Sequence, residues 1–366
     1  MAELRIEQLL REMVNRKASD LHLRVGVPPV YRINGALQRL FDVRIDSAMM
    51  DSFLDDIMNR DQKQRFEANK ECDFAVGARD MGRFRVNVFR QRGTIAVVIR
   101  HIKAVIPAFE DLHFPEVIRD LALTKRGLVL VTGTTGSGKS TTLASMIDYI
   151  NQKESVNVIT VEDPIEYLYK DNVAIISQRE IGVDTLSYAN ALRAALRQDP
   201  DVLLVGEIRD LETMQIALTA ADTGHMVFAT IHTTNAVETI HRVLSMYPPH
   251  QHDEVRLLLA EVLAGIISLL LLPTKDGKGR VTAAEILVNT GAIKEYIQDK
   301  NKIDMVEQAV AEGHIQYHSQ TFDQALLELY QNEQISLETA MNAATNRDDF
   351  DLKIRGISGT SDRGWM

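Results

Sequence analysis

The sequence predicts an α/β fold, in which a mostly parallel sheet with helices on its faces follows a small α+β domain. From about residue 110 onward, short apolar segments typical of buried strands alternate with segments typical of helices. Before about residue 100, strand-like runs follow one another with turn residues between them. A glycine-rich motif lies between a strand and a helix of the second part, where parallel sheets commonly hold their functional loops.

Residues 1–100 are predicted to form the small α+β domain. Amphipathic helices are expected over residues 4–14 and 48–58. The pair Asn34-Gly35 directly follows a strand-like run and predicts a hairpin with a type I′ turn. Strands are expected over residues 30–33, 73–76, 82–89 and 94–100, of which the last two are expected to form a second hairpin.

The rest of the chain divides into segments of different composition. Residues 101–109 contain Pro107 and are predicted to be a linker. Residues 110–285 are expected to form the α/β core, and residues 286–350 a helical region. Residues 351–366 are polar and contain Gly and Ser, so a disordered tail is expected there.

The composition is that of a globular protein, with 45% hydrophobic and 25% charged residues. The single cysteine, Cys72, excludes a disulfide framework and a cysteine-based zinc site within one chain, and it indicates a reducing compartment. The first residues lack the apolar core of a signal peptide. The longest apolar run, residues 262–272, is shorter than the roughly 20 residues that span a bilayer, so a buried helix is expected there.

Residues 133–140 match G-x-x-x-x-G-K-[ST], the phosphate-binding loop of nucleoside triphosphatases. The apolar run before the motif predicts a buried strand and the residues after it a helix, so a chance glycine-rich turn is the weaker alternative. Glycines let backbone N–H groups surround an anion, and the helix N-terminus adds its positive dipole end. Lys139 is expected to reach the β- and γ-phosphates, and the Ser140 hydroxyl to hold Mg²⁺. The residues predicted to bind the nucleotide are Gly133, Thr134, Thr135, Gly136, Ser137, Gly138, Lys139, Ser140 and Thr141.

Two acidic residues follow further apolar strands. Glu162 comes after the strand-like residues 156–161, and Glu207 after the strand-like residues 202–205. Because working residues lie at the carboxyl ends of the strands in open α/β sheets, these acids are candidates to orient water or to hold Mg²⁺. Gly206-Glu207 replaces the Asp usual at the end of a Walker B strand. For Glu162, an acidic turn without function is an equally good explanation.

Two histidines, His225 and His232, bracket a fourth strand-like run. A lone histidine is more often structural than functional. Two that flank a strand of this fold suggest a sensor for the γ-phosphate, whereas a metal site lacks a third ligand with sensible spacing.

Four segments together resemble the Walker A, Asp box, Walker B and His box motifs of the secretion ATPase superfamily, which drives type II secretion and type IV pili. Over nearly the whole chain, the sequence is similar to the pilus retraction ATPases of the PilT/PilU family. Assembly-type members are longer, and many carry a four-cysteine zinc module, whereas this chain has one cysteine. Features of PilT and of PilU both occur, and that choice stays open. The four segments are residues 133–140, 161–166, 197–210 and 223–233.

The resemblance implies a ring-shaped homohexamer whose chains each have a PAS-like N-terminal domain and a RecA-like P-loop ATPase domain, with ATP and Mg²⁺ bound between them. On this basis our hypothesis is that Glu162 is the general base that polarises the attacking water. Arg85 and Arg100 match, by spacing and strand position, the arginine pair that closes onto the γ-phosphate. Arg83 shares a strand face with Arg85 and is a rival. Solvated hairpin arginines without function remain the alternative.

The implied function is a Mg²⁺-dependent ATPase motor that powers type IV pilus retraction and twitching motility. Such an enzyme is expected in the cytoplasm, docked on an inner-membrane platform protein. A PilU-like accessory ATPase or adaptor, acting with a paralogous retraction ATPase, is the second possibility. A DNA-transfer motor is less favoured, and no nucleic-acid partner is expected, because the net charge is −10.

The chain departs from the family pattern at two places. Leu269 occupies the Gln position of a common Ile-Ser-Gln-x-Leu sequence, and Leu270 follows it. Lys294 occupies the Arg position of the Ala-Ile-Arg motif of retraction enzymes. Lysine keeps the charge of that arginine but cannot form its bidentate contact.

Overall fold

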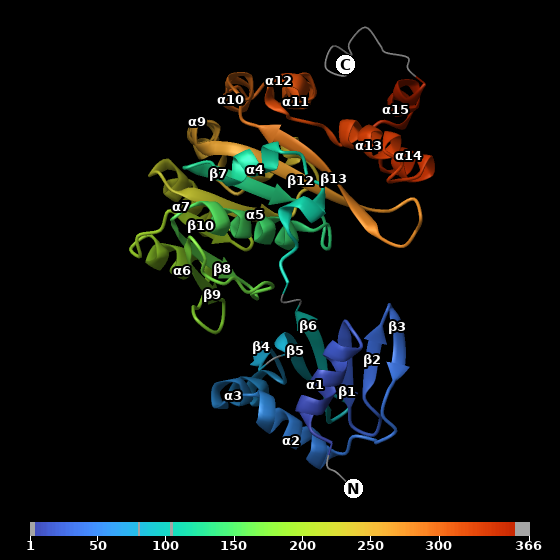
Figure 1. Ribbon diagram of the computed structural model, residues 1–366. Helices are drawn as coiled ribbons and strands as arrows, with labels where there is room; N and C mark the ends of the chain where they lie inside the picture. Colours follow the sequence, from blue (N-terminus) through green and yellow to red (C-terminus); the bar gives the residue numbers. More distant parts are fainter. Residues whose placement is uncertain (1–3, 80, 103–104, 356–366) are drawn as a thin grey trace. The chain divides into compact units, whose positions relative to one another are not determined.

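The computed structural model describes residues 4–79, 81–102 and 105–355, and the chain divides into two compact units (Figure 1). The first unit comprises the residues up to Val105 together with Glu166–Leu168, and the second comprises the others. Each unit has its own sheet and its own hydrophobic core. Among the described residues, no helix combines the length and the apolar character needed to cross a membrane.

The first unit is a six-stranded antiparallel sheet with helices packed on one face. The strand order is β3-β2-β1-β6-β5-β4, and every neighbouring pair is antiparallel. Leu9 of a helix, Phe53 of another and Phe84 of a strand share its core. Its elements are α1 (Ile6–Asn15), β1 (Asp20–Arg24), β2 (Val30–Ile33), β3 (Ala36–Arg39), α2 (Ser47–Ile57), α3 (Arg60–Asn69), β4 (Glu71–Ala78), β5 (Gly82–Gln91) and β6 (Thr94–Ile102).

Both predicted hairpins of this unit are confirmed. Asn34 has φ 49° and Gly35 φ 83°, which is the backbone of a type I′ turn between β2 and β3. The hairpin of β5 and β6 places Arg85 directly opposite Arg100. Side chains alternate along β5, so Phe84 is buried in the core while Arg85 points to the other face.

The second unit contains a seven-stranded sheet of order β13-β12-β7-β11-β10-β8-β9. Its strands are parallel except for β13, which pairs antiparallel with β12. This sheet confirms the predicted α/β fold. The strands are β7 (Gly127–Thr132), β8 (Asn157–Glu162), β9 (Ile175–Glu180), β10 (Val202–Val205), β11 (Met226–Ile231), β12 (Leu263–Pro273) and β13 (Arg280–Val288).

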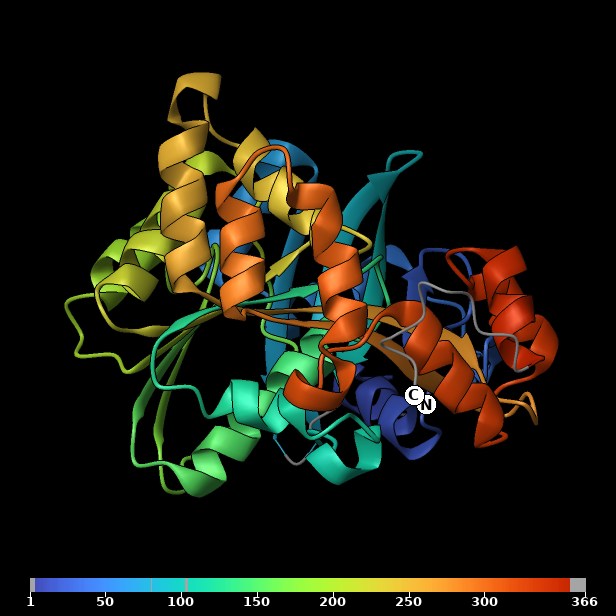
Figure 2. The ribbon, with the colours of Figure 1, turned by 90° about the horizontal axis from the view of Figure 1, so that it is seen from above.

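Helices cover both faces of this sheet (Figure 2). Along β7, Leu128 and Leu130 join a core with helices α6 to α11, whereas Val129 and Val131 join a core with η1, α4 and α5. This burial on both faces explains why the strands are continuous apolar runs. The helices are η1 (Phe109–Leu112), α4 (Val117–Ala122), α5 (Lys139–Lys153), α6 (Tyr188–Ala195), α7 (Leu211–Asp222), α8 (Ala236–Ser245), η2 (Pro249–Gln251), α9 (His252–Val262), α10 (Gly291–Gln298), η3 (Ile303–Met305), α11 (Val306–Glu312), α12 (His314–Tyr317), α13 (Phe322–Gln331), α14 (Leu337–Ala343) and α15 (Arg347–Ile354).

The helix predicted over residues 262–272 is wrong, because the chain changes there from the end of α9 to β12. A short apolar run fits a buried helix and a buried strand equally well. The neighbours decide the outcome, since β12 lies between β7 and β13 and bonds to both. Gly265 marks the close packing, because a Cβ there would lie 2.8 Å from the carbonyl oxygen of Leu287.

Two predicted boundaries also change. The strand β13 continues to Val288, so the helical region begins after residue 286 rather than at it. The helix α15 extends to Ile354 and includes the first residues of the tail expected over 351–366. Residues 356–366 of that expected tail lie outside the described residues.

Gly265→Ala should destabilise the second unit. The new methyl group would also meet Leu121 at 3.0 Å, and overpacking of this kind costs about 1–3 kcal/mol. We expect the thermal unfolding midpoint, followed by circular dichroism, to fall by several degrees. Gly291→Ala is the matched control, since a Cβ there meets nothing within 4 Å. Equal midpoints for the two variants would contradict this account of β12.

Candidate active site

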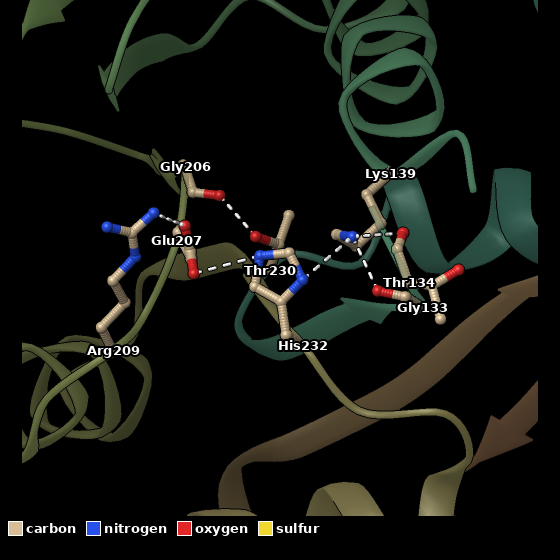
Figure 3. Close-up of polar contacts among 8 residues, drawn as sticks. All are labelled: Gly133, Thr134, Lys139, Gly206, Glu207, Arg209, Thr230 and His232. Atoms are coloured by element: carbon tan, nitrogen blue, oxygen red, sulfur yellow. Dashed lines mark hydrogen bonds and ion pairs between the residues drawn. The ribbon is translucent and has the colours of Figure 1, made fainter. Parts of the chain in front are cut away.

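The loop of residues 133–140 connects β7 to α5 and encloses the ammonium group of Lys139. Lys139 is 8% exposed. Its Nζ donates hydrogen bonds to the carbonyl oxygens of Gly133 at 2.7 Å and Thr134 at 2.9 Å (Figure 3). Burying an ammonium group is costly unless its protons are bonded. The loop backbone therefore holds the positive charge beside the segment expected to surround phosphate.

Gly133 has no space for a side chain. Its φ is +136°, and a Cβ would lie 2.4 Å from Ser137 Oγ and 2.5 Å from the carbonyl oxygen of Leu269. The strand β12, which carries Leu269, therefore packs directly against the start of the loop. Only glycine fits at the point where the chain leaves β7.

The end of the loop passes directly into α5. Gly138 occupies the N-cap with φ 106°, and Lys139 begins the helix. The first backbone N–H groups of a helix have no acceptor within the helix, and together with the helix dipole they attract anions. The structure therefore places the predicted nucleotide-binding residues in one continuous turn, in which Gly133, Thr134, Thr135, Gly136, Ser137 and Gly138 precede the helix and Lys139, Ser140 and Thr141 open it.

Glu207 and His232 lie beside Lys139, each just after the carboxyl end of a strand. His232 Nε2 lies 3.1 Å from Glu207 Oε1, and His232 Nδ1 lies 3.5 Å from Lys139 Nζ. Arg209 Nη2 donates a hydrogen bond to Glu207 Oε2 at 2.6 Å. Figure 3 shows these four side chains as a continuous polar chain that ends at the loop. Two residues predicted to act on phosphate and Mg²⁺ are therefore adjacent to the predicted phosphate-binding lysine.

The environment of Glu207 favours its ionised form. Burial by itself raises the pKa of this carboxyl group, but the hydrogen bond from Arg209 and the charges of His232, Arg209 and Lys139 lower it, and the net shift of the pKa is downward. A carboxylate is a preferred ligand of Mg²⁺. Glu207 is therefore in the right protonation state to contact that ion.

Glu162 lies at the end of β8, next to the end of β10. Its Oε1 accepts hydrogen bonds from Thr160 Oγ1 at 2.6 Å and Gln178 Nε2 at 3.2 Å. A Cβ on Gly206 would lie 3.2 Å from Glu162 Cα. A side chain at position 206 would therefore crowd the end of β8, and the carboxylate at this strand end belongs to the next residue, Glu207. Two strands separate β8 from β7, so Glu162 is further along the sheet edge than Glu207.

His225 lies at the opposite edge of the sheet from His232. Its Nδ1 lies 2.9 Å from the carbonyl oxygen of Ala220, and its own carbonyl oxygen accepts a hydrogen bond from the N–H of Gly127, at the start of β7. The six residues of β11 separate the two histidines, and a strand of that length spans about 20 Å. Within one chain, the prediction that His225 senses the γ-phosphate is therefore wrong. Only His232 lies at the edge that carries Lys139.

Arg85 and Arg100 lie in the first unit, paired across β5 and β6 on the face that carries no core. Arg100 Nε lies 3.0 Å from Asp20 Oδ1, and Arg85 Nε lies 3.8 Å from Asp73 Oδ1. The Arg100 side chain is 66% exposed and the Arg85 side chain 44%. Arg83 shares this face by strand alternation. The structure brings the predicted pair together, and its action on phosphate stays a prediction.

The two departures from the family pattern are accommodated locally. Leu269 is buried in the core that α4 and α5 share with the sheet, where an apolar side chain is suitable. Lys294 on α10 lies 3.3 Å from Glu261 on α9, an ion pair with exposed side chains. Such surface pairs contribute little to stability.

Sequence reasoning missed two residues of the site, Arg209 and Thr230. Thr230 Oγ1 donates a hydrogen bond to the carbonyl oxygen of Gly206 at 2.5 Å and so ties the turn before Glu207 to β11 (Figure 3). The only signal for Arg209 in the sequence was an opposite charge two residues after Glu207. The partner of Thr230 depends on strand order, which the sequence does not state.

Comparison with known proteins places the chain in a family. Residues 1–346 match the family model described as type II/IV secretion system protein. The type IV pilus retraction ATPase PilT of Pseudomonas aeruginosa is 42% identical over 345 residues, which are 94% of this chain and 99% of that protein. The type IV pilus ATPase PilU of the same organism is 40% identical over 352 residues, which are 96% and 92%.

A solved structure agrees with these relatives. The crystal structure of the pilus retraction motor PilT with bound ADP superposes with a TM-score of 0.89 at 46% identity, covering 94% of this chain and 98% of that chain. The resemblance predicted from the four motifs is confirmed, and the chain belongs to the type II/IV secretion system protein family.

Proposed function

We propose that this protein is a Mg²⁺-dependent ATPase that powers type IV pilus retraction. The observation that carries the proposal is the polar chain from Lys139 through His232 to Glu207, at the carboxyl ends of neighbouring parallel strands. That edge of the sheet is where phosphate loops of this fold class bind nucleotide. The similarity to PilT, named as a retraction ATPase and solved with ADP, supports the same function.

Each group at this edge has a role in the proposal. The loop amides and Lys139 bind the phosphates, and His232 senses the γ-phosphate. Glu162 acts as the general base that polarises the attacking water. Ser140 and Glu207 would hold Mg²⁺, which neutralises charge on the β- and γ-phosphates. Such sites use few protein ligands because phosphate and water complete the coordination, and no cluster of three metal-ligating side chains occurs in the described residues.

In the same proposal, Arg85 and Arg100 complete the site when the two domains close, and they stabilise the negative charge that develops on the γ-phosphate. Both arginines now lie near carboxylates, those of Asp73 and Asp20. The Arg85–Asp73 pair is exposed on both sides, and such pairs are weak, about 0–1 kcal/mol, so Arg85 can exchange its carboxylate for a phosphate oxygen at little cost. The Asp20 side chain is only 10% exposed, but Arg32 Nε lies 3.8 Å from its second oxygen, so a positive charge stays beside Asp20 when Arg100 changes partner.

The working unit we propose is a homohexameric ring in the cytoplasm, docked on an inner-membrane platform protein. Domain opening and closing in turn around the ring would convert hydrolysis into movement of the pilus. The accessory role is the second candidate, because the identity to PilU, 40%, is close to the 42% identity to PilT. A motor that moves DNA is disfavoured by the net charge of −10.

Glu162→Gln should abolish turnover while nucleotide binding persists. Loss of a general base lowers kcat by about 10²–10⁴-fold. The measurement is ATP hydrolysis by the purified protein alone, with Glu166→Gln as the control. Unchanged turnover in the Glu162 variant would refute the base assignment, and turnover only with a second ATPase present would favour the accessory role.

The same variant tests the biological function. In a cell lacking this gene, complementation with the wild type should restore surface motility, and complementation with Glu162→Gln should leave abundant pili that do not move. Rescue by both would show that hydrolysis by this protein is dispensable. Absence of pili in the deletion strain would point to assembly instead of retraction.

His232→Ala should lower kcat by about 100-fold, because it removes the link between Lys139 and Glu207 at the site of charge development. His225→Ala is the matched control from the other end of β11 and should change kcat less than about twofold, since it lies at the opposite sheet edge from Lys139. Steady-state hydrolysis separates them. Equal losses would show that His225 acts at a site that one chain does not form.

Arg85→Ala and Arg100→Ala should each lower kcat by on the order of 100-fold or more, since an arginine on the transferred phosphoryl group has an effect of that size. Arg90→Ala on the same strand is the control, because Arg90 is ion-paired with Glu67 at 3.1 Å. If all three variants hydrolyse ATP equally fast, the arginine assignment is wrong.

A further inference from the structure

An acidic residue, Glu285, is buried in the middle of the apolar strand β13. Its exposure is 7%, and it lines a cavity of about 670 Å³ that Gly133 and Thr134 of the phosphate loop also line. Burying a carboxyl group is costly unless it accepts hydrogen bonds. Its partners therefore show what the residue holds in place.

The two hydrogen-bond donors to Glu285 in the described part of the chain belong to other elements of the site. Its Oε1 accepts a hydrogen bond from the backbone N–H of Ala236 at 2.6 Å and one from Ser268 Oγ at 3.3 Å. Ser268 lies on β12 between Glu285 and Thr132, the residue that precedes the phosphate loop. One carboxyl oxygen therefore joins the start of α8 to the strands that support the loop.

The His232 segment, residues 232–235, connects β11 to α8 and ends where α8 begins. Asn235 caps the helix by accepting from the N–H of Glu238 at 2.8 Å. Thr234 N donates to the Glu238 carboxylate at 2.7 Å, and Thr233 Oγ1 lies 2.7 Å from Thr239 Oγ1. These bonds make the segment and the first turn of α8 one rigid piece, and Glu285 fastens that piece to the sheet.

We infer that Glu285 is a positioning residue for the proposed hydrolysis, because its bonds to Ala236 and Ser268 hold the His232 segment at a fixed distance from the phosphate loop. The inference rests on the proposed function of this site. It gives a reason for an acid in an otherwise apolar strand. His232 Nδ1 lies 3.5 Å from Lys139 Nζ. Among the described hydrogen bonds, the bond from Ala236 to Glu285 is the one that joins the His232 segment to β12 or β13.

The protonation of Glu285 adds a second readout. Burial raises the pKa of this carboxyl group to about 7, although the bonds from Ala236 and Ser268 oppose the shift. The charges that raise it further are Glu307 on α11 and Asp323 on α13. Asp304, Glu238 and His241 line the same cavity. Because the pKa is raised in the buried state, ionisation costs that state free energy despite the stronger acceptor that it creates, so the tether loosens as the pH rises through about 7.

The first test is amide hydrogen exchange at Ala236 in the full chain. Glu285→Ala removes the acceptor and should speed exchange at Ala236 at least tenfold, whereas Glu285→Gln keeps an acceptor oxygen and should change it less than about threefold. Glu307→Gln is the matched control, an acid of the same cavity with no hydrogen bond to this segment in the described part of the chain. Exchange at Ala236 that is unchanged in Glu285→Ala would overturn the inference.

The second test is steady-state hydrolysis. Glu285→Ala should lower kcat at least tenfold with the KM for ATP within about twofold of the wild type, because the loop and Lys139 are intact. Wild-type kcat should fall as the pH rises through about 7, because ionisation of Glu285 loosens the tether, and Glu285→Gln, which has no carboxyl group to titrate, should lack that step. Unchanged kcat in Glu285→Ala, or the same pH step in Glu285→Gln, would overturn the inference.

The proposed function and the tether by Glu285 can be refuted independently of each other. A wild-type protein without ATP turnover would contradict the proposed function, while the exchange measurement would still decide whether Glu285 tethers the segment. Turnover in the wild type together with unchanged exchange at Ala236 in Glu285→Ala would contradict the tether alone.

Discussion

The ammonium group of Lys139 is almost completely withdrawn from water, and much of the second unit is arranged around that constraint. A buried positive charge needs acceptors for its protons and nearby negative charge. The carbonyl oxygens of Gly133 and Thr134 supply the first, and Glu207, reached through His232, supplies the second. The same arrangement prepares the site for an anion, since a phosphate can replace the loop carbonyls as the partner of the lysine.

The sheet meets this constraint through its strand order. Parallel strands end at one edge, so β7, β11 and β10 deliver the loop, His232 and Glu207 to the same place. The other neighbour of β7 supports the loop from behind, because the Leu269 carbonyl of β12 packs where a side chain on Gly133 would be. Glu285 extends that support from β13 to the start of α8. The loop is therefore held from both sides by strands that are distant from it in sequence.

The arginine pair of the first unit depends on a different constraint, the pleat of an antiparallel sheet. Since Arg85 and Arg100 are opposite each other on β5 and β6, their side chains share a face. Two adjacent positive charges repel, and the nearby carboxylates of Asp73 and Asp20 offset that repulsion. Both arginine side chains are themselves exposed, which suits residues proposed to change partners during a catalytic cycle.

Some features could be predicted from the sequence because their physics is short-range. The turn of Asn34 and Gly35 needs only two residues that tolerate positive φ. The Arg85–Arg100 pairing needs a hairpin and strand alternation. The separation of His225 from His232 follows from the length of a single strand, and the sequence contained that information before the structure showed it.

The sequence by itself determined the phosphate loop and the family, because glycine geometry, the lysine and the helix start all lie within one turn of chain. Only the tertiary structure decided that residues 263–273 are a strand, since an apolar run without periodicity takes the structure of its neighbours. It also decided the partner of Glu285, which lies 49 residues away at Ala236. Contacts at that separation depend on strand order and packing, which the local propensity of the residues does not predict.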